Sequence, residues 1–265
     1  MPFYGTILKM KTRLDIPASY NLPIGDDFLD MNERIGHFIQ LTWQKEIYCI
    51  GCDRQINRSF AQGYCYPCFL QSPQTSECIF KPHLCKAHLG ESRDIEWSKK
   101  NCLTDTYVYL SLTSHLKVGV TKASHIPSRW IDQGAHYAIK FAKTPNRYLA
   151  GMIEVELSQH ISDRTQWRKM IQGDYININL LDKKNELSNL LSQKMQKYIL
   201  NDDEITSLQY PGINKPEKIK SINLDKNPEF KGKLTGIKGQ YLILDNQNVI
   251  NVRKYTGYTL NINLG

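Results

Sequence analysis

Two Cys-x-x-Cys pairs constrain this chain more than any other feature of its sequence. Cys49 and Cys52 form the first pair, Cys65 and Cys68 form the second, and twelve residues, 53–64, separate them. Each pair turns the backbone so that both thiolates face one point, and two pairs complete a tetrahedral sulfur shell that suits Zn²⁺. The spacing therefore predicts a structural zinc ribbon. Its saturated shell leaves no position for catalysis at that ion.

The remaining cysteines follow the first four closely. They are Cys78, Cys85 and Cys102, and His88 follows Cys85 with two residues between them, which is the same spacing as in the Cys-x-x-Cys pairs. We expect a second zinc site formed by these three cysteines and His88. His83 is an alternative to His88 that sequence does not resolve. The competing interpretation is that the cysteines are reduced core residues.

Seven cysteines is an odd number, which argues against a secreted disulfide framework. The N-terminal residues lack a basic start followed by an apolar stretch, and no run of roughly 18 apolar residues occurs. We therefore expect a cytoplasmic protein with reduced thiols and no membrane segment. Hydrophobic residues make up 41% of the chain and charged residues 23%, which is globular composition. The net charge of +8 favours an anionic partner such as nucleic acid, DNA or RNA.

Pattern changes along the chain divide it into four segments. Residues 1–48 are β-rich, with a hairpin turn predicted at Gln44–Glu46. Residues 49–105 are the cysteine-rich region, and 106–210 read as an α/β module with added helices. Residues 211–265 alternate in short runs around glycines, which predicts a small β-barrel or meander. The chain is thus predicted to be an α+β protein.

The module at 106–210 opens with two apolar runs, 106–112 and 116–121, which predict a hairpin. Helical spacing then predicts four helices, which begin near Ser128, Pro145, Asp163 and Asn185. The first of them is expected to continue through Phe141, with Trp130, Gly134 and Ala138 on the same face.

Four polar side chains of this module suit phosphodiester cleavage. Glu154 can bind Mg²⁺ or Mn²⁺, and Arg129 can fork onto phosphate oxygens. Tyr109 or Lys117 can take or relay a proton if its pKa is lowered. Thr121 and His136 are further candidates for phosphate or water contacts. The alternative is structural: Arg129 and Glu154 form a salt bridge between helices, and Tyr109 is a core residue.

These residues also carry a resemblance. Over nearly its full length the chain resembles an uncharacterised bacterial and archaeal domain-of-unknown-function family. Its marks here are the runs Lys117 to Thr121, Arg129 to Ala135, Gly151 to Val155 and Gly236 to Tyr241. Residues 106–160 resemble the GIY-YIG endonuclease superfamily, on Val108-Tyr109, Lys117-Val118-Gly119, Arg129 and Glu154.

The resemblance implies a GIY-YIG-like ββαα module in which Tyr109, Lys117, Arg129 and Glu154 are catalytic. The chain departs from the patterns at two positions. Lys117 replaces the tyrosine of the second nuclease motif, which puts the identity of the general base in question. Ser92 stands where the related family has a cysteine, which bears on the second zinc site.

Three functions from different classes compete. The first is a metal-dependent nuclease that acts on DNA or RNA phosphodiesters. The second is a non-catalytic, zinc-containing nucleic-acid-binding module, which the positive charge also favours. The third is a zinc-stabilised scaffold for a protein partner that sequence does not identify. A small-molecule enzyme is compatible with the same residues.

Overall fold

The computed structural model describes residues 2–161, 165–212, 215–216 and 218–265. The chain forms two compact units, of which the first combines Met1–Leu70 with Leu208–Gly265 and the second is Gln71–Ser207. The β-rich segments predicted at the two ends of the chain thus belong to one unit, and the second unit is inserted between them. The helix start expected at Asp163 lies outside the described residues.

The first unit is built from two sheets whose strands pair mostly antiparallel. Strands pair in the order β1-β14-β5-β11-β12-β13-β10 in the larger sheet and β2-β3-β4 in the smaller one. The strands are β1 (Phe3–Thr6), β2 (Lys11–Arg13), β3 (Ser19–Ile24), β4 (Asp27–Asp30), β5 (Phe38–Ile47), β10 (Lys220–Ser221), β11 (Glu229–Lys238), β12 (Tyr241–Leu244), β13 (Asn248–Asn251) and β14 (Tyr258–Leu264). Short helices are η1 (Asn32–Arg34), α1 (Tyr66–Gln71) and η7 (Val252–Tyr255).

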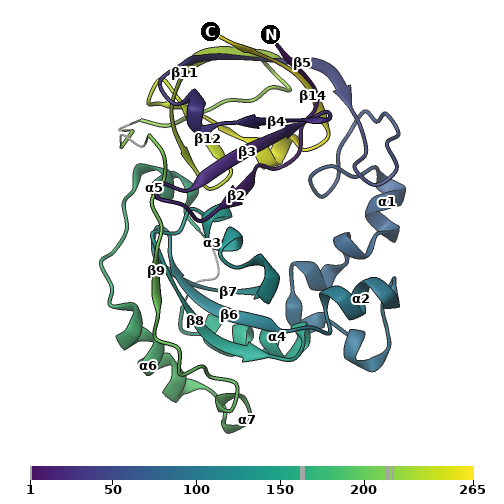
Figure 1. Cartoon of the computed structure of the whole chain (residues 1–265). Helices are drawn as coiled ribbons and strands as arrows, with labels where there is room; N and C mark the ends of the chain where they lie inside the picture. Colours follow the sequence, from purple (N-terminus) through teal and green to yellow (C-terminus); the bar gives the residue numbers. More distant parts are fainter. Residues whose placement is uncertain (1, 162–164, 213–214, 217) are drawn as a thin grey trace. The chain divides into compact units, whose positions relative to one another are not determined.

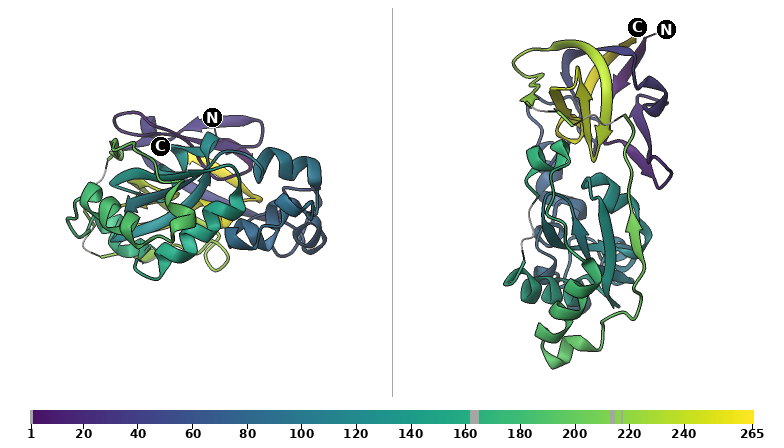
Figure 2. Two further views of the ribbon diagram at one scale, coloured as in Figure 1. Left: turned by 90° about the horizontal axis from the view of Figure 1, so that it is seen from below. Right: turned by 90° about the vertical axis from the view of Figure 1, so that its left-hand side faces the viewer.

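The two ends of the chain meet in this unit. β1 pairs antiparallel with β14, with Phe3 opposite Ile262, and the N and C marks lie together in Figures 1 and 2. β11, β12 and β13 follow one another as an antiparallel meander. The prediction of a C-terminal meander is therefore confirmed, and the alternative of a closed barrel is not, because the sheet ends at β1 and β10.

The hairpin turn expected at Gln44–Glu46 is a bulge within one long strand. β5 runs from Phe38 to Ile47, and its pairing with β14 jumps from Trp43 opposite Leu260 to Ile47 opposite Tyr258. Lys45 takes a left-handed φ of 61° inside this bulge. Turn-forming residues therefore produced a local kink rather than a chain reversal.

The second unit contains a four-stranded sheet in the order β7-β6-β8-β9. Its strands are β6 (Thr106–Leu112), β7 (Leu116–Lys122), β8 (Tyr137–Thr144) and β9 (Ile205–Ser207). Its helices are η2 (Pro73–Thr75), η3 (Glu77–Ile79), η4 (Pro82–Leu84), η5 (Ala87–Leu89), α2 (Ile95–Asn101), η6 (Ala123–His125), α3 (Ser128–Asp132), α4 (Arg147–Ser158), α5 (Trp167–Gln172), α6 (Leu180–Leu190) and α7 (Gln193–Gln196).

The predicted hairpin is confirmed, because β6 and β7 pair antiparallel over their full lengths. The first predicted helix is wrong beyond Asp132, where α3 ends. Ala138 and Phe141 lie instead on β8, which pairs with β6 on one side and β9 on the other. The apolar residues at these positions suit either a helix or a strand. This segment forms a strand because it pairs with the free edge of β6.

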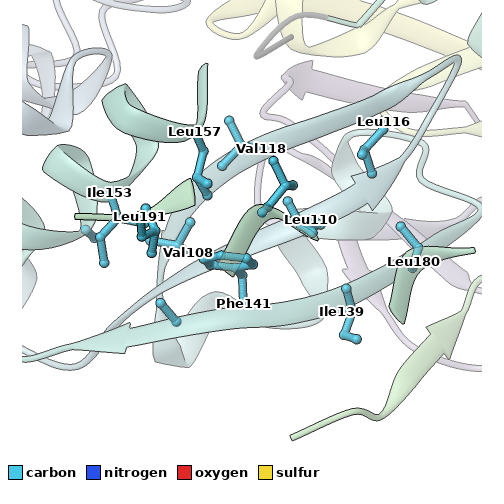
Figure 3. Close-up of a cluster of buried hydrophobic side chains, with 13 residues drawn as sticks. Val108, Leu110, Leu116, Val118, Ile139, Phe141, Ile153, Leu157, Leu180 and Leu191 are labelled. Carbon is cyan, nitrogen blue, oxygen red and sulfur yellow. The ribbon is translucent and has the colours of Figure 1, made fainter. Parts of the chain in front are cut away.

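The core of the second unit lies on one face of this sheet. Val108, Leu110, Val118 and Phe141 meet Ile153 of α4, and side chains of α6 complete the cluster (Figure 3). Alternation along the strands places Tyr109, Lys117 and Gly119 on the opposite face. Within the described ranges, none of the helices combines the length and apolar character needed to cross a lipid bilayer.

Candidate metal centre and active site

The four cysteines of the two predicted knuckles meet at one point in the first unit. Their sulfur atoms all lie within 4.8 Å of one another, and the Sγ atoms of Cys52 and Cys65 are 3.8 Å apart. Tetrahedral sulfurs about 2.3 Å from an ion stand about 3.8 Å from each other. Cys49, Cys52, Cys65 and Cys68 are thus positioned to bind a metal ion, and the geometry fits structural zinc.

Backbone amides support these sulfurs. The N–H groups of Gly51 and Cys65 point at Cys49 Sγ, at 3.4 and 3.2 Å, and Cys68 N lies 3.5 Å from Cys65 Sγ. Such donors hold negative charge on a thiolate and orient it toward the ion. The turn of each knuckle therefore supplies both the ligand and the dipoles that stabilise it.

The thiols titrate unequally because they share one site. Burial raises the pKa of Cys49, but the amides of Cys65 and Gly51 outweigh it and lower this pKa to about 6. Hydrogen bonding to Cys65 and Cys52, together with burial, raises the pKa of Cys68 to about 12. Four thiolates cannot coexist here without a cation, which is the requirement that a divalent ion meets.

In the second unit, Tyr109 of β6 meets Arg129 of α3 and Gln133, the residue that caps this helix. In the amide orientation that satisfies both neighbours, Gln133 donates to Tyr109 Oη at 2.8 Å and accepts from Arg129 Nε at 3.2 Å and Nη2 at 3.3 Å. The Tyr109 ring meets Trp130 edge-on at 6.1 Å between centroids. Tyr109 is completely buried, whereas Arg129 is only partly so.

The charge of Glu154 acts on this cluster. Its charge raises the pKa values of both Tyr109 and Arg129. Burial is the main cause of the raised pKa of Tyr109, and the nearby guanidinium only partly opposes it. Burial lowers the pKa of Arg129, but Tyr109, Asp132 and Glu154 outweigh it. At neutral pH the site therefore holds a protonated phenol beside a guanidinium cation.

Lys117 is the fourth predicted catalytic residue. It is 6% exposed and pairs with Ser111 on β6, two positions along from the pairing of Tyr109 with Gly119. Cross-strand partners share a face, so Lys117 lies on the face of the sheet that carries Tyr109. Thr121 follows on the same face of β7 and is 6% exposed. His136 packs its ring against Tyr175 instead, at 4.3 Å between centroids.

The residues predicted to form the second zinc site make different contacts in the structure. Cys78, Cys85 and Cys102 lie together in the second unit, and their thiols interact with one another. His88, the predicted fourth ligand, stacks its ring on Tyr148 with centroids 4.4 Å apart. His83 lies in η4, two positions before Cys85 along the chain.

Two residues that contact these sites were not predicted from the sequence to have a functional role. Gln133 joins Tyr109 to Arg129. Its position four residues after Arg129 was a usable signal, because residues at this spacing share a helix face. Arg147 interacts with the Cys102 thiol and lowers its pKa, after the larger effects of the two neighbouring thiols and against burial. Nothing in the local sequence pattern links Arg147 to that cysteine.

Fold and site together define an α+β protein with four cysteines positioned to bind a metal ion. The chain belongs to the family described as protein of unknown function (DUF2797), whose pattern matches residues 36–260. No curated protein matches the chain, and no solved structure does either.

Proposed function

We propose that this protein is a metal-dependent nuclease-like enzyme that acts on nucleic-acid phosphodiesters, with a structural zinc in its first unit. The observation that carries the proposal is the cluster in which Gln133 joins Tyr109 to Arg129 while the charge of Glu154 acts on both. The order of these residues along the chain resembles the GIY-YIG superfamily. The net charge of +8 suits a polyanionic substrate.

Each residue has a role that its surroundings support. Arg129, held at Nε and Nη2 by Gln133, would direct its remaining N–H groups at a phosphate. Glu154, partly exposed on α4, would be the carboxylate that binds Mg²⁺ or Mn²⁺. A cation bound there would neutralise phosphate charge and lower the pKa of a bound water. Lys117 would add positive charge beside the phosphate.

Tyr109 fits a positioning role better than that of general base. Its burial raises its pKa, so the phenol stays protonated at neutral pH and cannot accept a proton readily. Its hydroxyl instead fixes the amide that holds Arg129. Within this proposal neither Tyr109 nor Lys117 has to be the general base, because a cation held by Glu154 would lower the pKa of the attacking water.

One observation favours a second candidate, a non-catalytic nucleic-acid-binding module. Tyr109 is sealed completely, and Trp130 is 2% exposed with no partner for its indole nitrogen among the described residues. A buried cluster of this kind can hold a fold without turnover. Nucleic acid would then bind without being cut, and the binding would weaken steeply with salt.

The test is cleavage of mixed DNA and RNA substrates by the full chain with Mg²⁺ or Mn²⁺. Glu154→Gln and Arg129→Lys should each reduce the cleavage rate on the order of a hundredfold or more. Glu156→Gln is the matched control on the same helix, because Glu156 accepts hydrogen bonds from Ser192 N and Oγ, both at 2.9 Å. That variant should cut at the normal rate.

The outcomes separate the candidates. Cleavage that persists in Glu154→Gln rejects Glu154 as the metal ligand. Salt-sensitive binding without cleavage in the unaltered protein supports the binding module and rejects the nuclease. Neither cleavage nor binding, in protein that retains its fold, rejects both.

A further inference from the structure

Three cysteines of the second unit converge from three separate short elements. Cys78 lies in η3, Cys85 follows η4 and Cys102 follows α2. Each thiol interacts with the other two, and Cys85 and Cys102 are 3% and 1% exposed. All are free thiols. The three cysteines therefore join η3, the end of η4 and the end of α2 at one place in the second unit.

The segment around these cysteines has few means of holding itself together. Residues 72–103 form single-turn η helices and the seven-residue α2. Large apolar side chains that would normally build a core are instead exposed on it, namely Phe80, Leu84, Leu89, Ile95 and Leu103. A segment that buries so little apolar surface needs a cross-link, and a metal ion supplies one.

A hollow of about 290 Å³ lies against the three cysteines. All three line it, together with Glu91 and Ser92, and His88 is not among its lining residues. Glu91 is turned to Lys86 in an exposed ion pair at 3.2 Å. An ion held by the three sulfurs would therefore face open space at its fourth position.

Arg147 supplies the charge that such an ion would require. Three thiolates around a divalent cation carry a net charge of −1, and burying that charge without a partner is costly. The guanidinium of Arg147 interacts with Cys102, and its backbone N–H donates to Cys102 O at 2.8 Å. Its Nε is buried with no partner among the described residues, so the side chain retains a donor for this site.

We propose that Cys78, Cys85 and Cys102 form a second metal site, a three-thiolate site for a soft divalent ion such as Zn²⁺, whose fourth position opens into the hollow and takes exchangeable solvent. Three protein ligands with one open position is the arrangement of zinc sites that bind or activate a small molecule. Among the described residues, only the four-cysteine centre has all its ligand atoms within 4.8 Å. With three protein ligands against four, we expect this site to release its ion before the four-cysteine centre does.

Metal content tests the stoichiometry. Purified full-length protein should hold about two zinc ions per chain, one for each site. Cys85→Ser and the matched variant Cys52→Ser, which removes a ligand of the first centre, should each hold about one. Limiting chelator should remove one ion readily, and Cys85→Ser should lack that labile fraction. About one ion in both the unaltered protein and Cys85→Ser overturns the proposal.

The unaltered protein tests the same site if Cys85→Ser does not fold. Alkylation read by mass spectrometry should leave Cys78, Cys85 and Cys102 protected in the zinc-loaded protein and modified after mild chelation, with Cys49 still protected. Loaded with Co²⁺, the protein should change its visible absorption when azide is added, because azide enters the open position. Alkylation that zinc does not affect, or absorption that azide does not affect, contradicts the three-ligand site.

Discussion

Gly119 and Tyr109 face each other across β7 and β6, and a Cβ atom at Gly119 would lie 2.5 Å from the hydroxyl oxygen of Tyr109. The tyrosine is completely buried, so its ring has no room to swing aside. Gly119 thus makes the space in which the hydroxyl reaches Gln133. The glycine of the Lys117-Val118-Gly119 motif has a steric reason to be there.

Gly119→Ala should destabilise the protein by roughly 1–3 kcal/mol, because the methyl group overpacks a core that cannot relax. It should also break the hydrogen bond between Tyr109 and Gln133, so that Gln133 no longer holds the guanidinium of Arg129 in place. Urea denaturation measures the free energy of unfolding.

Tyr109→Phe provides the control for this overlap. Phenylalanine removes the oxygen that the methyl group would meet, so the double variant should lose less stability than the sum of the two single changes. Additive losses would mean that the hydroxyl is not what Gly119 accommodates.

Removal of metal from the four-cysteine centre should destabilise the first unit by several kcal/mol, because folding and metal binding are coupled in such sites. A strong zinc chelator should lower the melting temperature, and added Zn²⁺ should restore it while Mg²⁺ should not, since four thiolates select a soft ion. Cys52→Ser should melt at the lower temperature with or without chelator. A chelator-insensitive melting temperature in the unaltered protein would contradict a structural metal.

The four-cysteine centre was predictable because its chemistry is local. Each knuckle places two ligands within four residues, and the two pairs flank a short turn, so spacing alone specifies the geometry. The β6–β7 hairpin was predictable for a similar reason, since two alternating runs stand three residues apart. Neither needs information from distant parts of the chain.

Strand β8 and the cluster of Tyr109, Arg129 and Gln133 depend on contacts between distant parts of the chain. β8 was mistaken for helix because Ala138 and Phe141 suit either structure, and only the open edge of β6 selects a strand. Sequence order suggested that Arg129 and Glu154 work together, but the burial of Tyr109 and the bridge by Gln133 follow from how α3 covers the sheet. That packing changed the role we assign to Tyr109 from base to positioning residue.

Gly151 on α4 marks a close approach of a different kind. A Cβ atom there would overlap the backbone of His83 and Pro82 in η4, and a backbone cannot move away as a side-chain tip can. Gly151→Ala should therefore cost about 2 kcal/mol or more and separate η4 from α4. Ala150→Gly, at a buried neighbour on the same helix, should cost only about 1 kcal/mol.

The same variant bears on the three cysteines, because Cys85 directly follows η4. Thermal unfolding measures the loss of stability, and zinc content measures the effect on Cys85. Equal stability losses in Gly151→Ala and Ala150→Gly would show that the helix and η4 do not need this contact.

Lys238 gives the protein a distinctive dependence on pH. Its side chain is 1% exposed, and burial, aided by the charge of Lys215, lowers its pKa to about 7. In the unfolded chain the pKa of lysine is about 10.4. Between these values the unfolded state binds more protons than the folded state, so stability rises with pH. Below pH 7 the lysine is charged in both states, and this contribution is absent.

The unaltered protein should therefore gain up to about 1.4 kcal/mol per pH unit between pH 7 and 10 relative to Lys238→Met. At pH 6.5 the methionine variant should be the more stable of the two, because it avoids burying a cation. Lys231→Met, at an exposed position on the same strand β11, is the matched control and should follow the unaltered protein. Urea denaturation across this pH range measures the differences. Parallel profiles for Lys238→Met and the unaltered protein would show that Lys238 stays charged in the folded state, held by a partner that offsets its burial.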